Sequence, residues 1–183
     1  WMEEQLAAGS MQNVRHLWTS VRPNGDNRPH DLNRVEIRIC DLVADPSELL
    51  AITALAELRL QQLLRDRETH DPLVASALTA EELAALCDRN DRAAATASLE
   101  AELQHWRSGQ PINARTWLEA LLQELEPLAQ ELQLSAVLAP LEGLLRNGNQ
   151  AMRWLARHRG GEAIADIVAS DAAALALREE ALG

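Results

Sequence analysis

A chain of 183 residues is long enough to bury a core of its own, and its 47% of hydrophobic residues argues against a disordered protein. Its formal net charge of −11 excludes general affinity for nucleic acid, because binding to the phosphate backbone requires a positive surface. The sequence contains no recognisable signal peptide and no apolar run of membrane-spanning length. It therefore predicts a cytoplasmic protein with neither nucleic acid nor membrane as a partner.

The first part of the chain is typical of β-strands. Residues 2–8 resemble the end of a helix, and residues 15–22 and 33–41 then alternate apolar and polar side chains with the period of a strand. The segment between them, residues 23–32, is rich in turn residues and predicts a loop. An isolated strand pair is only marginally stable in water. Because of this, and because the chain begins at Trp1, we expect the strands to belong to a larger sheet and the chain to be the C-terminal part of a longer protein.

From residue 46 onward the pattern is helical. Asp45 can cap a helix that starts at Pro46, and Thr79 with Glu82 has the spacing of a capping box. The apolar stripe predicted for the first helix consists of Leu49, Ile52, Ala56, Leu60 and Leu63. Further helices are predicted over residues 79–109 with a break near Asn90, 114–133 with a kink or split at Pro127, 137–146, 150–158, 162–169 and 171–181.

These elements together predict an α+β fold. An antiparallel strand pair lies in residues 1–45 and is followed by a mainly α-helical region in residues 46–183. The pattern favours no oligomeric state over another.

The second strand carries the polar side chains that could perform chemistry. Arg34, Glu36 and Arg38 share one face of it, opposite the apolar residues, and Arg22 ends the strand before it. A carboxylate beside guanidinium groups stays ionised and can bind a divalent cation, while guanidinium groups bind phosphate through two parallel hydrogen bonds. The spacing also fits a solvated strand face whose charges neutralise each other.

A resemblance to a known family bears on whether this strand face binds metal and phosphate or is a solvated face. The run SVRPNGDNRPHDLNRVEIRICDLVADPSELLAITALAEL resembles the C-terminal active-site segment of the glutamine synthetase superfamily. Within that superfamily, HLWTSVRPNGDNRPHDLNRVEIRICDLVADP is most similar to glutamate–cysteine ligases of the cyanobacterial type. Residues 78–109 and 148–161 resemble the helical C-terminal part of the same ligases. The likeness is specific in residues 16–46 and loose afterwards.

The resemblance implies roles for three residues. Glu36 matches a ligand of the divalent metal, Arg22 matches an arginine that contacts the nucleotide phosphates, and Arg38 matches a catalytic arginine that contacts the transferred phosphoryl group or the glutamate substrate. It gives no role to Arg28 or Arg34. It further implies that ATP is a substrate together with L-glutamate and L-cysteine, that Mg²⁺ or Mn²⁺ is required, and that the other half of the active site lies in a preceding part of the same ligase.

The leading hypothesis is therefore a glutamate–cysteine ligase, which performs the first step of glutathione synthesis through a γ-glutamyl phosphate. A related carboxylate–amine ligase with a different amine acceptor fits the same residues. So does a non-catalytic helical module for protein interaction. A cluster of cations in residues 146–159 could bind an anion or could lie on solvated helix ends, and Cys40 and Cys87 have no metal-binding or disulfide spacing.

Overall fold

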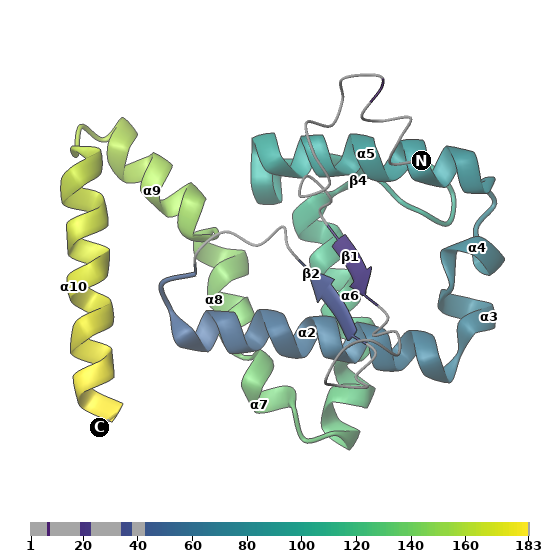
Figure 1. Ribbon diagram of the computed structural model, residues 1–183, viewed down its shortest axis with the longest axis horizontal. Helices are drawn as coiled ribbons and strands as arrows, with labels where there is room; N and C mark the ends of the chain where they lie inside the picture. Colours follow the sequence, from purple (N-terminus) through teal and green to yellow (C-terminus); the bar gives the residue numbers. More distant parts are fainter. Residues whose placement is uncertain (1–6, 8–18, 23–33, 38–42, 183) are drawn as a thin grey trace. The chain divides into compact units, whose positions relative to one another are not determined.

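The computed structural model (Figure 1) describes residues 7, 19–22, 34–37 and 43–182, within two units that comprise residues 1–42 and 43–183. The first unit contains β1 (Thr19–Arg22) and β2 (Arg34–Ile37). The elements of the second unit are α2 (Pro46–Arg65), α3 (Arg67–His70), α4 (Pro72–Ala75), α5 (Ala80–Ala97), the 3₁₀ helix η2 (Ser98–Glu100), β3 (Glu102–Gln104), β4 (Pro111–Asn113), α6 (Ala114–Glu131), α7 (Ser135–Leu138), α8 (Pro140–Asn147), α9 (Gln150–Arg159) and α10 (Ile164–Leu182). The predicted α+β fold with a mainly helical second part is confirmed.

Strands β1 and β2 pair antiparallel, as predicted. The ladder joins four residue pairs, from Thr19 opposite Ile37 to Arg22 opposite Arg34. The remaining residues of the predicted strands, 15–18, 33 and 38–41, lie outside the part of the chain that the structure describes, as does the predicted helix end apart from Ala7.

Helix α2 begins as its sequence predicts but buries a different face. The Asp45 carboxylate accepts a hydrogen bond from the Ser47 N–H at 2.9 Å, and Pro46 occupies the first turn. The buried positions are Ala51, Ala54 and Leu58. The predicted stripe was wrong at Leu49 and Leu60, which are 48% and 41% exposed. Small alanine side chains let neighbouring helices approach closely, and hydrophobic periodicity alone does not weigh that advantage against the size of leucine.

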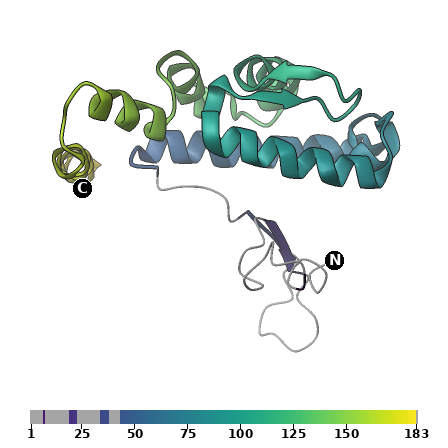
Figure 2. The ribbon, with the colours of Figure 1, turned by 90° about the horizontal axis from the view of Figure 1, so that it is seen from above.

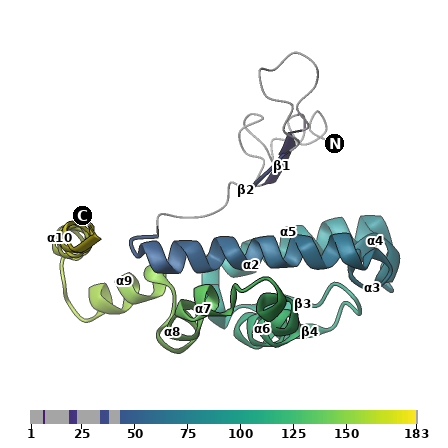
Figure 3. The same cartoon turned by 90° about the horizontal axis from the view of Figure 1, so that it is seen from below.

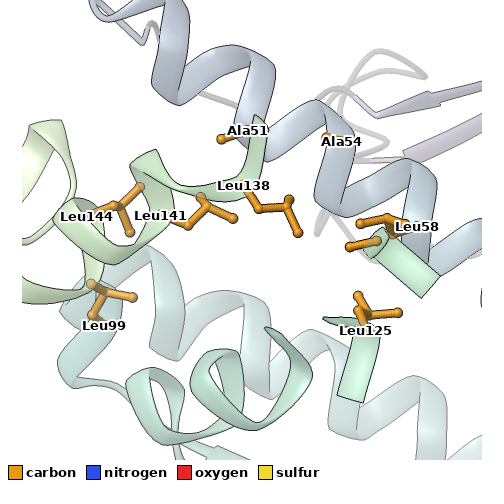
Figure 4. Packing of buried hydrophobic residues seen from close by; sticks show 9 residues of the cluster. Ala51, Ala54, Leu58, Leu99, Leu125, Leu138, Leu141 and Leu144 are labelled. Atoms are coloured by element: carbon orange, nitrogen blue, oxygen red, sulfur yellow. The ribbon is translucent and has the colours of Figure 1, made fainter. Parts of the chain in front are cut away.

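The core of the helical unit lies between α2 and the helices that pack against it, α6, α7 and α8. Figures 2 and 3 show α2 and α5 in one layer and α6 to α8, with the β3–β4 hairpin, in a second. Figure 4 shows Leu58 of α2 near Leu125 of α6, and the leucines of α7 and α8 continuing the contact along α2. The buried cluster consists of Ala51, Ala54, Leu58, Leu99, Leu125, Ala129, Leu138, Leu141 and Leu144.

Helix α5 starts at the predicted capping box, in which the Glu82 N–H donates to Thr79 Oγ1 at 3.2 Å and the Thr79 N–H donates to Glu82 Oε2 at 2.8 Å. The predicted extension to Gly109 was wrong, because the helix ends at Ala97 and the chain continues through η2 into β3. The predicted break near Asn90 is also absent. Asn90 instead uses its side-chain amide to hold β3, with 2.8 Å hydrogen bonds to both the N–H and the C=O of Gln104.

The last helices differ from the prediction in where one helix ends and the next begins. Helix α6 runs through Pro127, and the buried residues Leu125 and Ala129 on either side of the proline supply packing that offsets the lost backbone hydrogen bond. The two helices predicted for residues 162–181 form the single helix α10. Ser170 lies at the predicted break, and its hydroxyl donates to the carbonyl of Ile167 at 2.9 Å within the helix. None of the helices that the structure describes is long and apolar enough to cross a membrane.

The core predicts the effect of one substitution in α2. Leu58 is 0% exposed, so Leu58→Ala removes buried methyl groups and leaves a cavity, and we expect it to lower the free energy of unfolding by about 2–5 kcal/mol. Leu64→Ala is the matched control on the same helix, since Leu64 is 75% exposed and its truncation should change stability by less than about 0.5 kcal/mol. Urea denaturation followed by circular dichroism measures both. Equal losses would contradict the assignment of the buried face.

Candidate functional site

The β1–β2 ladder brings together two of the three site residues predicted from the sequence. Arg22 stands opposite Arg34, and Ser20 stands opposite Glu36. Residues that are opposite each other, or two apart along a strand, belong to the same face of a sheet. Arg22, Arg34 and Glu36 therefore occupy one face of the ladder, and Val21 and Val35 the other. Arg38 lies outside the described residues, as does Arg28.

The register adds a constraint that the sequence alone did not supply. Cross-strand neighbours on one face are about 5 Å apart, and like charges placed directly opposite each other are destabilising. The pair of Arg22 with Arg34 is such a juxtaposition, and Glu36 is two residues away from Arg34 on the same face, about 7 Å along the strand. A bound anion between two arginines removes their repulsion and accepts hydrogen bonds from both. The register thus places one acidic residue and two arginines on the same face of the ladder.

The described residues do not form a complete metal site by themselves. Among the residues that the structure describes, no group of three or more His, Cys, Asp or Glu side chains could hold a metal ion. Mg²⁺, however, is commonly bound by one or two carboxylates together with substrate phosphates and water. Glu36 is the acidic residue that the ladder register places on this face.

The cationic cluster of residues 146–159 resolves into separate ion pairs. Arg153 Nη2 contacts Glu48 Oε2 at 3.0 Å, and Arg157 Nη1 contacts Asp171 Oδ1 at 3.0 Å. Arg157 also binds Glu162, and this hydrogen bond lowers the pKa of the Glu162 carboxyl. The partners of Arg153 and Arg157 come from α2 and α10, at separations of 105 and 14 residues, so sequence proximity could not reveal them. These cations hold helices together rather than forming a shared anion site.

A second polar cluster surrounds the β3–β4 hairpin. The imidazole of His105 contacts two tryptophan rings, with centroid distances of 5.8 Å to Trp106, on which it stacks, and 5.0 Å to Trp117, to which it is tilted. Its Nδ1 accepts the Arg107 backbone N–H at 3.2 Å. Burial, followed by the charges of Arg107 and Arg59, lowers the pKa of His105, while Glu124 opposes the shift. The neutral imidazole is therefore the form that the folded hairpin accommodates.

The thiol of Cys87 is not activated for nucleophilic chemistry. Partial burial in α5, together with the charges of Asp91 and Asp88, raises its pKa. A thiol needs a lowered pKa to act as a nucleophile near neutral pH. Cys40, the other cysteine, lies outside the described residues.

Comparison with known proteins matches most of the chain to one family. The model of glutamate–cysteine ligase family 2 matches residues 1–170. A relative from Gloeobacter violaceus, provisionally named glutamate–cysteine ligase 2, is 29% identical over 173 residues, which are 93% of this chain and 43% of the relative. A relative from Frankia alni, provisionally named glutamate–cysteine ligase 2-1, is 28% identical over 166 residues, or 88% and 40% of the two chains. The chain thus spans about two-fifths of the length of these curated relatives, and no solved structure matches it.

The lowered pKa of His105 predicts how stability depends on pH. Because the folded state binds a proton at His105 less readily than the unfolded state, this residue contributes fully to stability above its unfolded pKa of about 6.5, and the contribution is lost as pH falls below that value. His105→Gln should therefore flatten the decline in the free energy of unfolding between about pH 7.5 and pH 5.5. Urea titrations of both proteins at these two pH values measure the difference. An unchanged decline in the variant would contradict the prediction.

Proposed function

The chain belongs to glutamate–cysteine ligase family 2, and we propose that it forms part of an ATP-dependent ligase that joins the side-chain carboxylate of L-glutamate to the amine of L-cysteine. The observation that carries this proposal is the ladder register, which places Arg22, Arg34 and Glu36 on one face. An ATP-dependent ligase must bind phosphate groups and a divalent cation side by side. This face presents a group suited to each.

The proposed reaction has two steps. The glutamate side-chain carboxylate attacks the terminal phosphorus of ATP, which forms γ-glutamyl phosphate and releases ADP. The cysteine amine then attacks the acyl carbon, phosphate leaves, and the amine loses a proton, so the products are γ-glutamylcysteine, ADP and phosphate. Phosphoryl transfer of this kind depends mainly on positioning and on neutralising charge in the transition state.

Each proposed site residue has a part in that neutralisation. Arg22, with Arg34 opposite it, binds the nucleotide phosphates through guanidinium hydrogen bonds. Arg38, two residues beyond Glu36, contacts the transferred phosphoryl group, and a planar guanidinium suits the flat, charged group that forms during transfer. Glu36 would hold Mg²⁺ or Mn²⁺, which supplies positive charge next to the phosphates when bound.

The rest of the active site is proposed to come from outside these residues. The chain spans 43% and 40% of the two relatives described above, and its described residues include no further carboxylate cluster for a metal. A glutamate pocket, an adenine site and additional metal ligands are therefore expected from a preceding part of the same ligase. We further propose that the ligase acts in the cytoplasm, in glutathione synthesis.

The first prediction from this proposal concerns the chain by itself. Purified residues 1–183 supplied with ATP, Mg²⁺, glutamate and cysteine should release no phosphate above background, because one strand pair cannot complete the nucleotide and metal sites. Phosphate release measures this. Turnover near the enzyme median of about 10 per second would contradict the proposal that further residues are required.

The second prediction concerns an active ligase that contains this chain. Glu36→Gln keeps the size of the side chain but removes the charge that a hard cation requires, so turnover should fall by about 10²-fold or more, and excess Mg²⁺ should restore part of it. Arg38→Lys keeps the charge but loses the planar pair of donors, and we expect a loss of about 10²-fold in kcat. Steady-state kinetics with varied Mg²⁺ and ATP measure both effects.

Arg146→Lys is the matched control for the arginine substitution. Arg146 is 70% exposed in α8 and forms an ion pair with Glu142 in the same helix, so its replacement should leave kcat within about twofold. If Glu36→Gln retains full turnover, the metal-ligand role is wrong. If Arg38→Lys matches the control, the phosphoryl contact belongs to another residue.

A further inference from the structure

Helix α2 carries a second apolar face that the helical unit does not cover. Its buried face, which includes Ala51 and Leu58, lies toward the layer of α6 to α8 that Figures 2 and 3 show on one side of the helix. At 3.6 residues per turn, Leu49, Leu60 and Leu64 belong to the opposite side. We define the outer face of α2 by the exposed residues on this side, which are Leu49, Leu50, Thr53, Glu57, Leu60 and Leu64.

The outer face has the composition of a surface that another part of a protein covers. All four of its leucines are at least 41% exposed, and they extend along about 22 Å of the helix. Single exposed apolar residues are common, but a continuous row of them marks an interaction site. A helix with apolar residues on both sides is typical of the interior of a larger protein. Hydrophobic periodicity predicted Leu49 and Leu60 as core residues, and a partner outside the helical unit would make them so.

A second copy of this chain is a poor partner for the outer face. In a twofold pairing of two α2 helices centred on this row, Glu57, which stands near its middle, meets the same residue of the other copy. Like charges brought together in this way oppose association. The formal net charge of −11 on each chain adds to the repulsion. The face therefore suits a partner whose surface differs from its own.

The relatives indicate which partner is at hand. The match spans 43% and 40% of the two relatives described above, so more than half of each relative lies outside it. The family model matches residues 1–170 and therefore includes α2. In such a relative, α2 and the additional residues belong to one polypeptide, and this linkage keeps their effective concentration high.

We propose that the outer face of α2 docks onto an apolar surface of the part of the ligase that precedes this chain. This docking presupposes the longer ligase proposed above, but it does not depend on which reaction that ligase catalyses. The leucines of the outer face lose contact with water in the docked state, and the burial of their apolar area stabilises it. Glu57 then requires a cation or a hydrogen-bond donor on the docked surface, because an unpaired buried carboxylate is destabilising.

Chemical labelling of a cysteine on the outer face tests the docking. Leu64→Cys is combined with Cys40→Ser and Cys87→Ser, both in residues 1–183 and in the ligase that contains them, and its reaction with N-ethylmaleimide is timed. Leu64 is 75% exposed, so the thiol should react freely in the chain alone and about tenfold or more slowly in the ligase. Glu119→Cys, at an exposed position of α6, is the control and should react at similar rates in both proteins.

The outcomes separate the docking from the proposed reaction. Equal rates for Leu64→Cys in the chain and in an active ligase would overturn the docking and leave the reaction in place. Protection in a ligase that makes no γ-glutamylcysteine would support the docking and count against the reaction. If Glu119→Cys is protected to the same extent, or if labelling of the chain alone slows as its concentration rises, the proposal is wrong, because the protection is general or comes from a second copy.

Two substitutions at Leu60, one helical turn before position 64, test whether apolar contact causes the protection. Leu60→Glu introduces a charge into the docked surface, so it should return the labelling rate at position 64 in the ligase to within about threefold of the rate in the chain alone. Leu60→Met keeps an apolar side chain of similar volume and should keep the protection. Because Leu60 is exposed within the helical unit, Leu60→Glu should shift the Tm of the chain alone by less than about 2 °C. Equal labelling rates in the two variants of the ligase would overturn the proposal.

Discussion

The close approach of α2 to the helices beneath it is the contact on which the helical unit depends. It is possible because Ala51 and Ala54 present almost no side chain, and Leu58 then fills the space next to Leu125. Any larger residue at the two alanines would separate α2 from α7 and α8 and open voids along the whole contact, since interiors tolerate little change in volume.

Polar contacts between distant parts of the chain then fix how α2 begins. The Gln150 side chain binds the backbone of Ala44 across 106 residues, and Arg153 binds Glu48 across 105. Both partners come from α9, so the start of α2 is held to a helix near the other end of the chain. The exposed partners of such pairs contribute little energy, but Glu48 is only 14% exposed and its pairing is correspondingly less screened by solvent.

Features that depend on interactions between residues close in sequence could be predicted, whereas features that depend on residues far apart in sequence could not. Asp45 with Ser47, and Thr79 with Glu82, interact within three residues, and both helix starts were predicted correctly. The two short strands were predicted from a period of two, and their antiparallel pairing followed. The β3–β4 hairpin was missed, and so was the role of Asn90, which looks in sequence like a helix breaker but holds β3 through hydrogen bonds to Gln104 that span 14 residues.

The candidate site could also be predicted only in part, because the pairing of residues across the two strands does not follow from the sequence pattern. Alternation placed Arg34 and Glu36 on one face of the second strand, but only the register shows that Arg22 is the residue directly opposite Arg34. The acidic partners of Arg153 and Arg157 could not be assigned from sequence either, because they lie on other helices. A cluster of cations in sequence is thus weak evidence for an anion site until the fold shows which carboxylates approach it.

The buried core of the helical unit contains no aromatic residue, and the residues proposed to perform chemistry lie in the other unit. With no Phe or Tyr in the sequence, its core must be built from aliphatic side chains, and the buried cluster contains only leucine and alanine. The described tryptophans contact polar or titratable side chains instead: Trp154 donates to Asp171, and the rings of Trp106 and Trp117 contact the ring of His105. The helical unit thereby has a core of its own, whereas the proposed ligase residues stand on a two-stranded ladder of the other unit, a structure that is marginal in water without further strands. Substitutions in the leucine core should therefore act through folding, and those on the ladder through binding and turnover, so the two kinds of effect can be measured separately.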